Sequence, residues 1–471
     1  MRNLLIATVS ALTLAACAAG PDYARPTLPA ASSGPFLSTK AGVTSAAPAP
    51  NDADPQWWRL YQDPVLDALV QDALAANADV RVAVARIAKA RASLREVRGD
   101  RLPSTEVSAG ATYGRITGNR LPQGIDRQSW VVDAGLTVGY EVDLFGRVSR
   151  GVEAARGDVA AAEADADAVR VTVAAETARA YADAASAADR LSVAERIVSL
   201  LDKSVALTAR RAEVGLTTKL DTARVAALRD QRAADIPAIA AERDAALFRL
   251  ATLTGRAPAD LPPVAAERRT TLRLDQPIPV GDGAALIARR PDVAAAERRL
   301  AAATARIGVA TADLYPQVTL GGSIGQTSSG LGNLFGAGPL RWLLGPLINW
   351  NFLNQEAARA RIAGAQADTQ AALATFDGTV LGALGETETA LSSYAHMLDR
   401  RTALQAARDQ AETAVKITRA QQREGAIDGL EALDAERTFA EAEATLALAD
   451  ARIADAQVDL FRALGGRWAK G

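Results

Sequence analysis

The sequence predicts a mainly α-helical protein that also carries strands suited to a membrane β-barrel, built as two tandem repeats. Three observations predict this fold class. Four stretches alternate apolar and polar residues, two segments of more than sixty residues contain no proline, and one order of motifs occurs twice. Of the 471 residues, 49% are hydrophobic but only 4% are aromatic, and this Ala-, Leu- and Val-rich composition is typical of long helices.

Charge and cysteine content exclude several classes of function. The 53 Lys and Arg residues against 55 Asp and Glu give a net charge of −2, so we expect no nucleic-acid partner. A single histidine and a single cysteine cannot form the usual zinc, iron–sulfur or Cys/His catalytic sites, so we expect no metal and no cofactor. An enzyme would have to use carboxylates or a lone serine, and we expect no enzymatic activity. No apolar run reaches the roughly 18–20 residues of a spanning helix, so a membrane-crossing part would consist of strands.

The N-terminus is predicted to be a signal peptide over residues 1–16, because a basic residue precedes the short apolar stretch Leu4–Leu14. Leu14-Ala15-Ala16-Cys17 resembles the bacterial lipobox, in which the cysteine is lipidated after cleavage. The alternative is a plain signal peptide followed by an incidental cysteine. Ala18, in place of Asp, favours the outer membrane as the destination. Residues 17–55, rich in Pro, Ala and Ser, are then expected to form an extended, lipid-anchored leash.

The repeats are predicted to cover residues 56–255 and 284–466, with a Pro-rich connector over 256–283 and a short tail at 467–471. Asp79 and Pro103 recur as Asp292 and Pro316, both at an offset of 213, and Gly215 recurs as Gly425 at an offset of 210. Each repeat is therefore expected to contain a helix, two strands, a very long helix, a glycine-containing tip and a second helix.

The strands are expected at about 104–114 and 130–145 in the first repeat, and at about 317–327 and 339–353 in the second. One face of each is apolar and the other polar, and in 130–145 the polar face carries Asp133, Glu141 and Asp143. We interpret these three acids as lining a lumen. Glu141 and Asp143 could suggest a paired-carboxylate hydrolase site, but they lie two residues apart on one face of one strand, which favours the lumen.

A soluble β-sandwich would alternate in the same way, but strand lengths near the roughly 9–11 residues of a membrane strand favour a barrel, as does the outer-membrane address. Four strands cannot close a barrel, and unpaired strand edges are not tolerated in lipid. A dimer would supply eight strands, and three copies would supply twelve, enough to leave a lumen.

The proline-free segments 151–214 and 356–424 predict very long, coiled-coil-like helices. The first would extend about 95 Å at 1.5 Å per residue, and it carries two adjoining apolar stripes. Two stripes indicate a neighbour on each side, as in the wall of a tube of helices, although a solid bundle is the alternative. The turns that end these helices form the predicted tip, where a channel would close and a partner would dock: Val214, Gly215, Leu216, Thr217, Leu220, Gly425, Gly429 and Leu430.

Several motifs in order carry a resemblance: Gly20-Pro21-Asp22-Tyr23, Trp57-Trp58 with Asp63-Pro64, Asp143-Leu144-Phe145-Gly146-Arg147, Val214-Gly215-Leu216 with Leu220-Asp221, and Arg290-Pro291-Asp292-Val293. With them the chain resembles the TolC-type outer-membrane efflux proteins, and within these the lipoprotein (NodT/OprM-like) branch that serves resistance-nodulation-division pumps. One departure is Leu353-Asn354-Gln355-Glu356-Ala357, where the family commonly has a Phe-Asp-Gly-Gly-Arg-like segment. Because of this departure, the resemblance does not predict whether this junction places a charged side chain in the lumen.

The resemblance implies a homotrimer whose twelve-strand outer-membrane barrel continues into a twelve-helix periplasmic tunnel. It implies a periplasmic adaptor and an inner-membrane pump as partners, outer-membrane lipid around the barrel, and an acidic constriction at Asp428 as the gate. The expected function is then a passive exit duct for drugs or other toxic small molecules. The alternative is a lipid-tethered periplasmic helical protein with a structural or adaptor-like role.

Overall fold

The computed structural model describes residues 19–28, 32–40, 43–45, 56–115, 128–274, 276–328, 340–427 and 429–465. The predicted signal peptide, Cys17, Asp428 and the tail at 467–471 lie outside these residues. Of the predicted tip residues, Gly429 and Leu430 are described only as the start of a helix.

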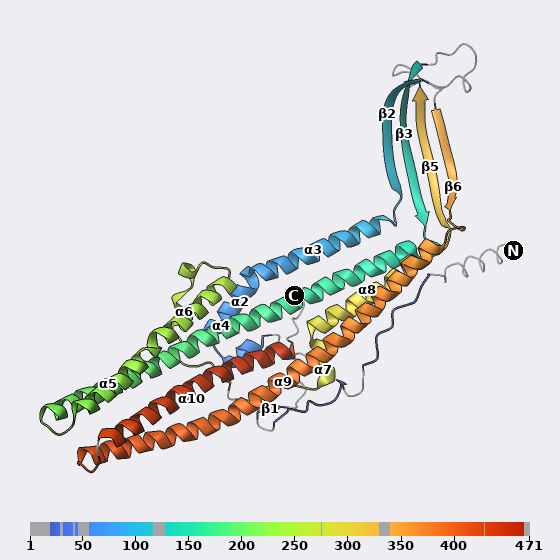
Figure 1. The fold of residues 1–471 in the computed structure, drawn as a ribbon. Helices are drawn as coiled ribbons and strands as arrows, with labels where there is room; N and C mark the ends of the chain where they lie inside the picture. The colour runs from blue at the N-terminus through green and yellow to red at the C-terminus, as the bar shows by residue number, and fades with distance from the viewer. Residues whose placement is uncertain are drawn as a thin grey trace, which may run out of the picture. The chain divides into compact units, whose positions relative to one another are not determined.

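Long helices and one four-stranded sheet make up the described chain (Figure 1). The strands are β1 (Thr44–Ser45), β2 (Ser104–Arg115), β3 (Gln128–Val142), β4 (Ile278–Pro279), β5 (Gln317–Ser328) and β6 (Leu340–Asn349). The α-helices are α2 (Pro64–Ala76), α3 (Ala78–Gly99), α4 (Arg147–Glu213), α5 (Lys219–Ala233), α6 (Asp235–Leu253), α7 (Gly283–Arg289), α8 (Pro291–Ala312), α9 (Glu356–Arg423) and α10 (Gly429–Leu464). Short 3-10 helices cover Trp57–Tyr61, Pro258–Asp260 and Pro263–Ala266.

The two longest helices, α4 with 67 residues and α9 with 68, occupy the proline-free segments of the sequence. The helices that follow α4 and α9 differ between the two repeats. In the second repeat α10 runs for 36 residues, whereas in the first the chain breaks at Ala234 between α5 and α6. Pro237 explains the break, because it lacks an N–H and is tolerated only in the first turn of a helix, where α6 places it.

Two of the predicted strands end earlier than the alternating pattern suggested. β3 stops at Val142 rather than at 145, and β6 stops at Asn349 rather than at 353. The apolar periodicity continues past both ends, but the backbone has already left the sheet. At the end of β3 this happens because Asp143 joins the next helix: its carboxylate accepts hydrogen bonds from the N–H groups of Val148 (3.0 Å) and Ser149 (2.8 Å) in the first turn of α4.

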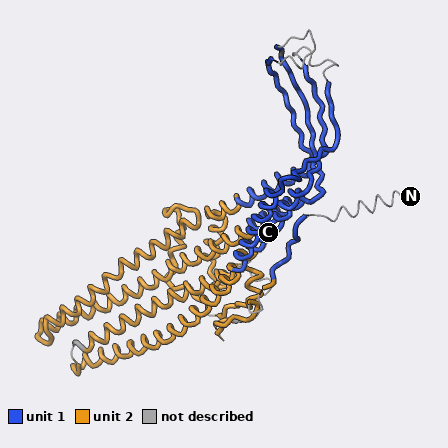
Figure 2. The backbone as a smooth tube through the Cα atoms, turned by 45° about the vertical axis from the view of Figure 1, so that its right-hand side comes forward, with its two compact units in different colours: residues 1–26, 86–163, 295–377 blue, residues 27–85, 164–294, 378–471 orange. Residues whose placement is uncertain are grey.

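The chain divides into two compact units, and neither follows a repeat (Figure 2). Unit 1 contains the chain up to Pro26, Arg86–Glu163 and Ala295–Asp377, and therefore holds the four-stranded sheet. Unit 2 contains Thr27–Ala85, Ala164–Ala294 and the chain from Gly378 onward. Each unit draws on both repeats, so a repeat is not an independent folding module.

In unit 1 the sheet has the order β2-β3-β5-β6 and every neighbouring pair is antiparallel. The helices of this unit approach one another closely because small residues face each other. A Cβ added to Gly157 of α4 would lie 2.9 Å from the Cβ of Ala302 on α8, so the contact depends on the absence of a side chain there. Leu94 of α3 and Val152 of α4 are buried in the same unit.

Unit 2 has the larger core, which lies between α2, α4, α6, α9 and α10. The Trp57-Trp58 motif belongs to this core: the Trp57 ring stacks on Phe461 of α10 at 4.6 Å between centroids, and Trp58 is 1% exposed. Gln457 is buried among these groups with its amide satisfied. Its amide nitrogen donates to the carbonyl of Leu274, and its oxygen accepts from the Leu274 N–H at 3.0 Å.

Asp63, which follows the tryptophans in the motif, is a buried carboxylate with several donors. It caps α2 by accepting from the N–H groups of Val65 (2.9 Å) and Leu66 (3.2 Å). It also accepts from the hydroxyl of Tyr181 (3.0 Å) and from the guanidinium of Arg268 (2.8 Å). The side chain is 6% exposed, so removing it would leave an arginine and a tyrosine without their shared acceptor.

We predict that Asp63→Ala lowers the free energy of unfolding by about 2–4 kcal/mol, because it removes a helix cap and one partner of a buried ion pair. Chemical unfolding followed by circular dichroism measures the loss. Asp72→Ala is the matched control on the same helix, since Asp72 pairs with Arg256 at 2.9 Å while 44% exposed. That control should cost about 0–1 kcal/mol. Equal losses in the two variants would contradict the structural role of Asp63.

A second buried acid gives a pH dependence. Asp455 of α10 is hydrogen-bonded to Asp183 of α4, and burial together with the Asp183 charge raises the pKa of Asp455 to about 7. Burial also raises the pKa of Asp183. Two carboxyl groups in contact share a proton, because both cannot ionise cheaply at close range. The folded state therefore retains a proton that an unfolded Asp, with a pKa of about 3.9, has already released.

We predict that this pair makes the protein more stable at pH 5 than at pH 8, by about 1–3 kcal/mol. Because the folded pKa lies above the unfolded one, the stabilisation is present below pH 4 and declines as the pH rises towards 7. Asp455→Asn should remove this slope, since its amide carries no titrating proton. The measurement is the unfolding free energy of both proteins across this range. Identical pH profiles would refute the assignment.

Candidate functional site

The sheet has one continuous apolar face that is open to its surroundings. The register places Val107, Leu136, Ile324 and Trp342 in one row across β2, β3, β5 and β6. Further rows on the same face pair Tyr140 with Leu320, and Val318 with Ile348. Trp342 is 73% exposed and Ile348 is 69% exposed. An apolar face of this extent, left uncovered by the chain's own helices, needs an apolar environment.

Aromatic residues lie at both ends of this face. Tyr113 of β2 and Trp130 of β3 pair at 5.5 Å near the loop end of the hairpin. At the other end, Phe145 stacks on Tyr315 at 4.5 Å, and Trp350 lies 5.5 Å from Phe352. Between them, the apolar positions of β3 run from Val132 to Val142, close to the roughly 9–11 residues of a tilted membrane strand. Two aromatic ends around an apolar band are typical of strands that cross a bilayer.

The opposite face is polar, and it carries two of the three acids that the sequence singled out. Asp133 accepts a hydrogen bond from the hydroxyl of Thr327 (2.6 Å) and pairs with Arg341 of β6 at 2.9 Å. Glu141 pairs through both oxygens with Arg147 at the start of α4, at 2.8 and 2.5 Å. Both carboxylates are therefore neutralised by an arginine, which the alternation of the strand could not indicate.

The third acid, Asp143, lies beyond β3 and caps α4. We placed Asp143 on the polar face because we predicted that the strand continues to residue 145. The strand ends at Val142, so that reason is wrong. Sequence reasoning also missed two apolar residues on the polar face of β6, Leu343 and Leu347. Leu347 lies over a glycine of β5: a Cβ added to Gly321 would lie 3.0 Å from a methyl carbon of Leu347. Leu343 is aligned with Ser323 of the same strand.

Both long helices end in the same kind of turn. At the end of α4, Gly215 has a φ of +78°, and the N–H groups of Gly215 and Leu216 donate to the carbonyls of Ala212 and Arg211 at 3.1 and 2.8 Å. At the end of α9, Gly425 has a φ of +73°, and Gly425 and Ala426 repeat the pattern with Gln422 and Gln421. This pair of backbone hydrogen bonds ends a helix at a glycine in the left-handed region.

Apolar side chains project from the first turn. Val214 is 70% exposed and Leu216 is 68% exposed, and Leu220 on the first turn of α5 is also exposed. α5 begins with a capping box, in which Thr218 and Asp221 each accept the other's backbone N–H at 3.2 and 3.0 Å. Hydrogen bonding to Thr218 lowers the pKa of Asp221. The turn is thus a defined structure that presents apolar groups to a partner or to solvent.

The segment that follows Cys17 is fixed to unit 1. The N–H of Ala19 donates to the carbonyl of Phe145 (3.0 Å), and Asp22 pairs with Arg150 of α4 at 2.5 Å. Gly20 lies so close to Gly308 of α8 that a Cβ on either residue would meet backbone atoms within 2.8 Å. The predicted leash is therefore held against the junction between the strands and the helices in its first described residues.

Later parts of the same segment are held in unit 2. The carboxylate of Glu388 on α9 accepts the N–H groups of Leu37 (2.7 Å) and Ser38 (3.0 Å), and Phe36 is buried in the core. β1 then pairs with β4. The Pro-, Ala- and Ser-rich composition indicated a free linker, but the described parts of 17–55 make specific contacts that no periodicity could predict.

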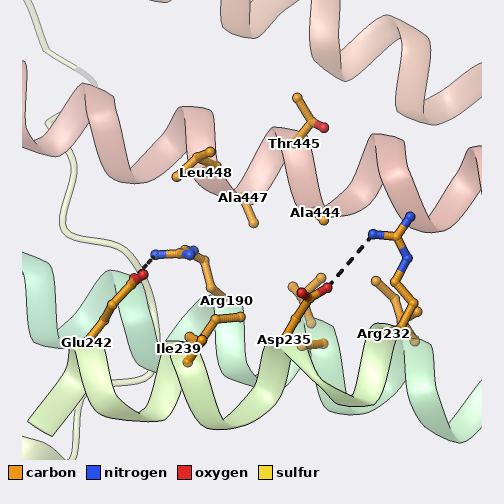
Figure 3. A pocket seen from close by; sticks show the side chains of 13 residues that line it. Arg190, Arg232, Asp235, Ile239, Glu242, Ala444, Thr445, Ala447 and Leu448 are labelled. Carbon is orange, nitrogen blue, oxygen red and sulfur yellow. Dashed lines mark hydrogen bonds and ion pairs between the residues drawn. The ribbon is translucent and has the colours of Figure 1, made fainter. Parts of the chain in front are cut away.

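We do not assign a binding site to the groove shown in Figure 3, because its charged side chains already have partners. It has a volume of about 370 Å³ and lies in unit 2 between α4, α6 and α10. Its charged groups are paired with one another: Arg190 with Glu242 at 2.6 Å, and Arg232 with Glu441 at 3.0 Å and Asp235 at 3.9 Å. Among the described residues, no three His, Cys, Asp or Glu side chains are arranged to hold a metal ion.

None of the described helices has both the length and the apolar composition needed to cross a bilayer.

Known proteins resemble this chain over nearly its full length. The sequence model of the family described as outer membrane efflux protein matches residues 69–256 and 284–466. Outer membrane protein OprJ of Pseudomonas aeruginosa is 32% identical over 473 residues, covering 99% of this chain and 96% of OprJ. The cation efflux system protein CusC of Escherichia coli O157:H7 is 28% identical over 461 residues, covering 97% of both proteins.

A solved structure also matches the fold of this chain. The solved structure of the outer-membrane channel OprN superposes with a TM-score of 0.88 at 35% identity, covering 96% of this chain and all of OprN. These matches confirm the resemblance drawn from the motifs, the outer-membrane location and the role as an efflux channel. With the family model matching both halves of the chain, this protein belongs to the outer membrane efflux protein family.

Proposed function

We propose that three copies of this chain form a passive exit duct through the outer membrane. The open four-stranded sheet is the observation that carries the proposal. β2 and β6 are its edges, and their outward backbone groups have no partner in the sheet. Since lipid does not tolerate unpaired edges, β6 of one copy pairs with β2 of the next, and three copies close a barrel of twelve strands. The polar face then lines the lumen and the apolar face contacts lipid.

The long helices extend the barrel into the periplasm. α4 and α9 supply two helical rows per copy, and the shorter helices of the two repeats supply one row each. Three copies of these four rows would give a tunnel of twelve helical rows. Proteins of this family work in tripartite systems with an adaptor and an inner-membrane pump. We infer from the family resemblance that the pump of this system belongs to the resistance-nodulation-division class and supplies the energy for export.

The cargo is proposed to be drugs or other toxic small molecules. Relatives differ in what their names state: CusC is a cation efflux protein, and TtgC of Pseudomonas putida is a toluene efflux pump protein. A shared duct with different cargoes fits a division of labour in which the pump selects the molecule. Asp133 and Glu141 lie on the face that lines the proposed lumen, each beside its arginine.

Lipid attached to Cys17 would anchor each copy at the level of the barrel's periplasmic rim. Ala19 is two residues from Cys17 and is bonded to Phe145, which follows β3. Acyl chains at that level enter the inner leaflet of the outer membrane. We propose the turn between α9 and α10 as the gate, where three copies of Asp428 would converge and repel one another.

We predict that Leu216→Asp impairs efflux while the amount of channel in the outer membrane is unchanged. An exposed leucine at the tip is suited to pack against the adaptor, and a charge there would weaken that contact by about 2 kcal/mol, roughly thirtyfold. Drug susceptibility and co-purification of the adaptor are the measurements. Phe248→Asp is the matched control, because Phe248 is equally apolar and 55% exposed but lies on α6.

Normal efflux in the Leu216 variant would make the turn merely structural. Gly215 is a poorer test, because its positive φ strains any side chain whatever the partner does.

We predict that Cys17→Ala protein, exported through an unlipidated signal, still requires detergent for extraction from the outer membrane. The reason is the apolar face of the sheet, which stays in lipid without the acyl anchor. Centrifugation of salt-washed membranes, followed by immunoblotting, measures the distribution. Complete release into buffer would instead support a periplasmic protein tethered only by its lipid.

A further inference from the structure

The charges on the polar face of the sheet do not cancel. Within β2, β3, β5 and β6 this face carries three acids, Glu106, Asp133 and Glu141, and one base, Arg341. Arg147 at the start of α4 adds a second base at the rim. The sum is −1 per chain, and Asp133 and Glu141 already hold the two arginines.

Glu106 is the acid left over. It lies near the middle of the polar face, where the register aligns it with Thr137, Ser323 and Leu343, none of which is charged. The side chain is exposed, and no ion pair joins it to another described residue. The acids that the sequence alternation singled out on β3 are thus compensated, and the uncompensated one is on a neighbouring strand.

Closing the barrel does not supply the missing cation. The strand that pairs with β2 in the proposed trimer is β6 of the next copy, and its polar face carries Arg341, Leu343, Gly345, Leu347 and Asn349. Its only cation, Arg341, is already held by Asp133. Whichever acid Arg341 contacts, the polar face together with Arg147 retains one net negative charge per copy, which makes three around the ring.

We propose that Glu106 makes the barrel lumen favour cationic over anionic solutes. The inference rests on the proposed trimeric duct. Three carboxylates around a water-filled lumen with low-dielectric walls create a negative potential, because such walls concentrate the field. Solutes of either sign must pass this ring after leaving the helical tunnel, so it acts on cargo that the pump has already released.

A cysteine at Thr137 measures the potential beside Glu106, because the two residues are directly opposed on adjacent strands. The only natural cysteine is Cys17. The purified full-length Thr137→Cys protein, reconstituted in liposomes, is treated with two small methanethiosulfonate reagents of similar size, one cationic and one anionic. The ratio of their reaction rates reports the local potential. Protein without the introduced cysteine provides the background rate.

The cationic reagent should react faster, and Glu106→Gln should lower the rate ratio by about fivefold at 0.1 M salt, where the Debye length is about 10 Å. At 1 M salt the effect of the substitution should nearly vanish. Arg341→Gln should raise the ratio, because it exposes Asp133. The double variant Asp133→Asn/Arg341→Gln should leave the ratio within about twofold of the starting protein, since it removes a compensated pair.

Two failures are distinguishable. If Thr137→Cys reacts readily with both reagents but Glu106→Gln leaves the ratio unchanged, the inference about Glu106 is wrong and the duct stands. If the thiol reacts with neither charged reagent in the folded protein, yet reacts after unfolding, the polar face does not line a water-filled lumen. That second result would overturn the proposed duct itself.

Discussion

The unsatisfied edges of a two-faced sheet are the constraint on which the rest of the structure depends. One face of the four strands presents tryptophan, leucine and isoleucine without cover, and the backbone of β2 and β6 lacks an outer partner. Water penalises the apolar face, and lipid penalises the unpaired edges. Only an arrangement that places the face in lipid and joins the edges to other strands satisfies both. In the proposed duct, further copies of the chain supply those strands.

The helices meet a different requirement, because long helices need packing partners along their length. Unit 1 relies on small residues such as Gly157 against Ala302, while unit 2 gathers the aromatic and aliphatic side chains around Trp57, Trp58 and Phe461. Buried polar groups in unit 2, among them Asp63 and Gln457, are matched by specific donors and acceptors. Such matching fixes one arrangement of the helices, because a shifted register would leave these groups unpaired.

The periodicity of apolar residues predicted position and type correctly for elements whose pattern depends on that helix or strand alone. The four strands and the two longest helices lie close to their predicted positions, and the turn glycines Gly215 and Gly425 have the positive φ that a helix stop requires. Local patterns failed where another element intervenes. Apolar alternation continued past Val142, but the cap that Asp143 gives to α4 had already ended the strand. From its composition, the segment after Cys17 was predicted to be a linker. Its contacts with Phe145 and Gly308 could not be predicted, because these residues are far away in sequence.

The charge of the polar face shows the same limit. Alternation along one strand identified Asp133 and Glu141, but only the register across strands brings Arg341 to Asp133, and only the fold brings Arg147 to Glu141. Glu106 stands out only once the register shows that the residues aligned with it carry no charge. Sequence therefore indicated which face is polar. The sign of its field required the pairing of four strands, which brings together residues as distant as Asp133 and Arg341, 208 positions apart.

The mass of the mature protein in detergent, measured by light scattering with the bound detergent subtracted, tests the central claim most directly. A mass of three chains would supply the twelve strands that leave no edge unpaired in the membrane. A mass of one chain, in protein that remains folded, would leave β2 and β6 without partners and would contradict the account.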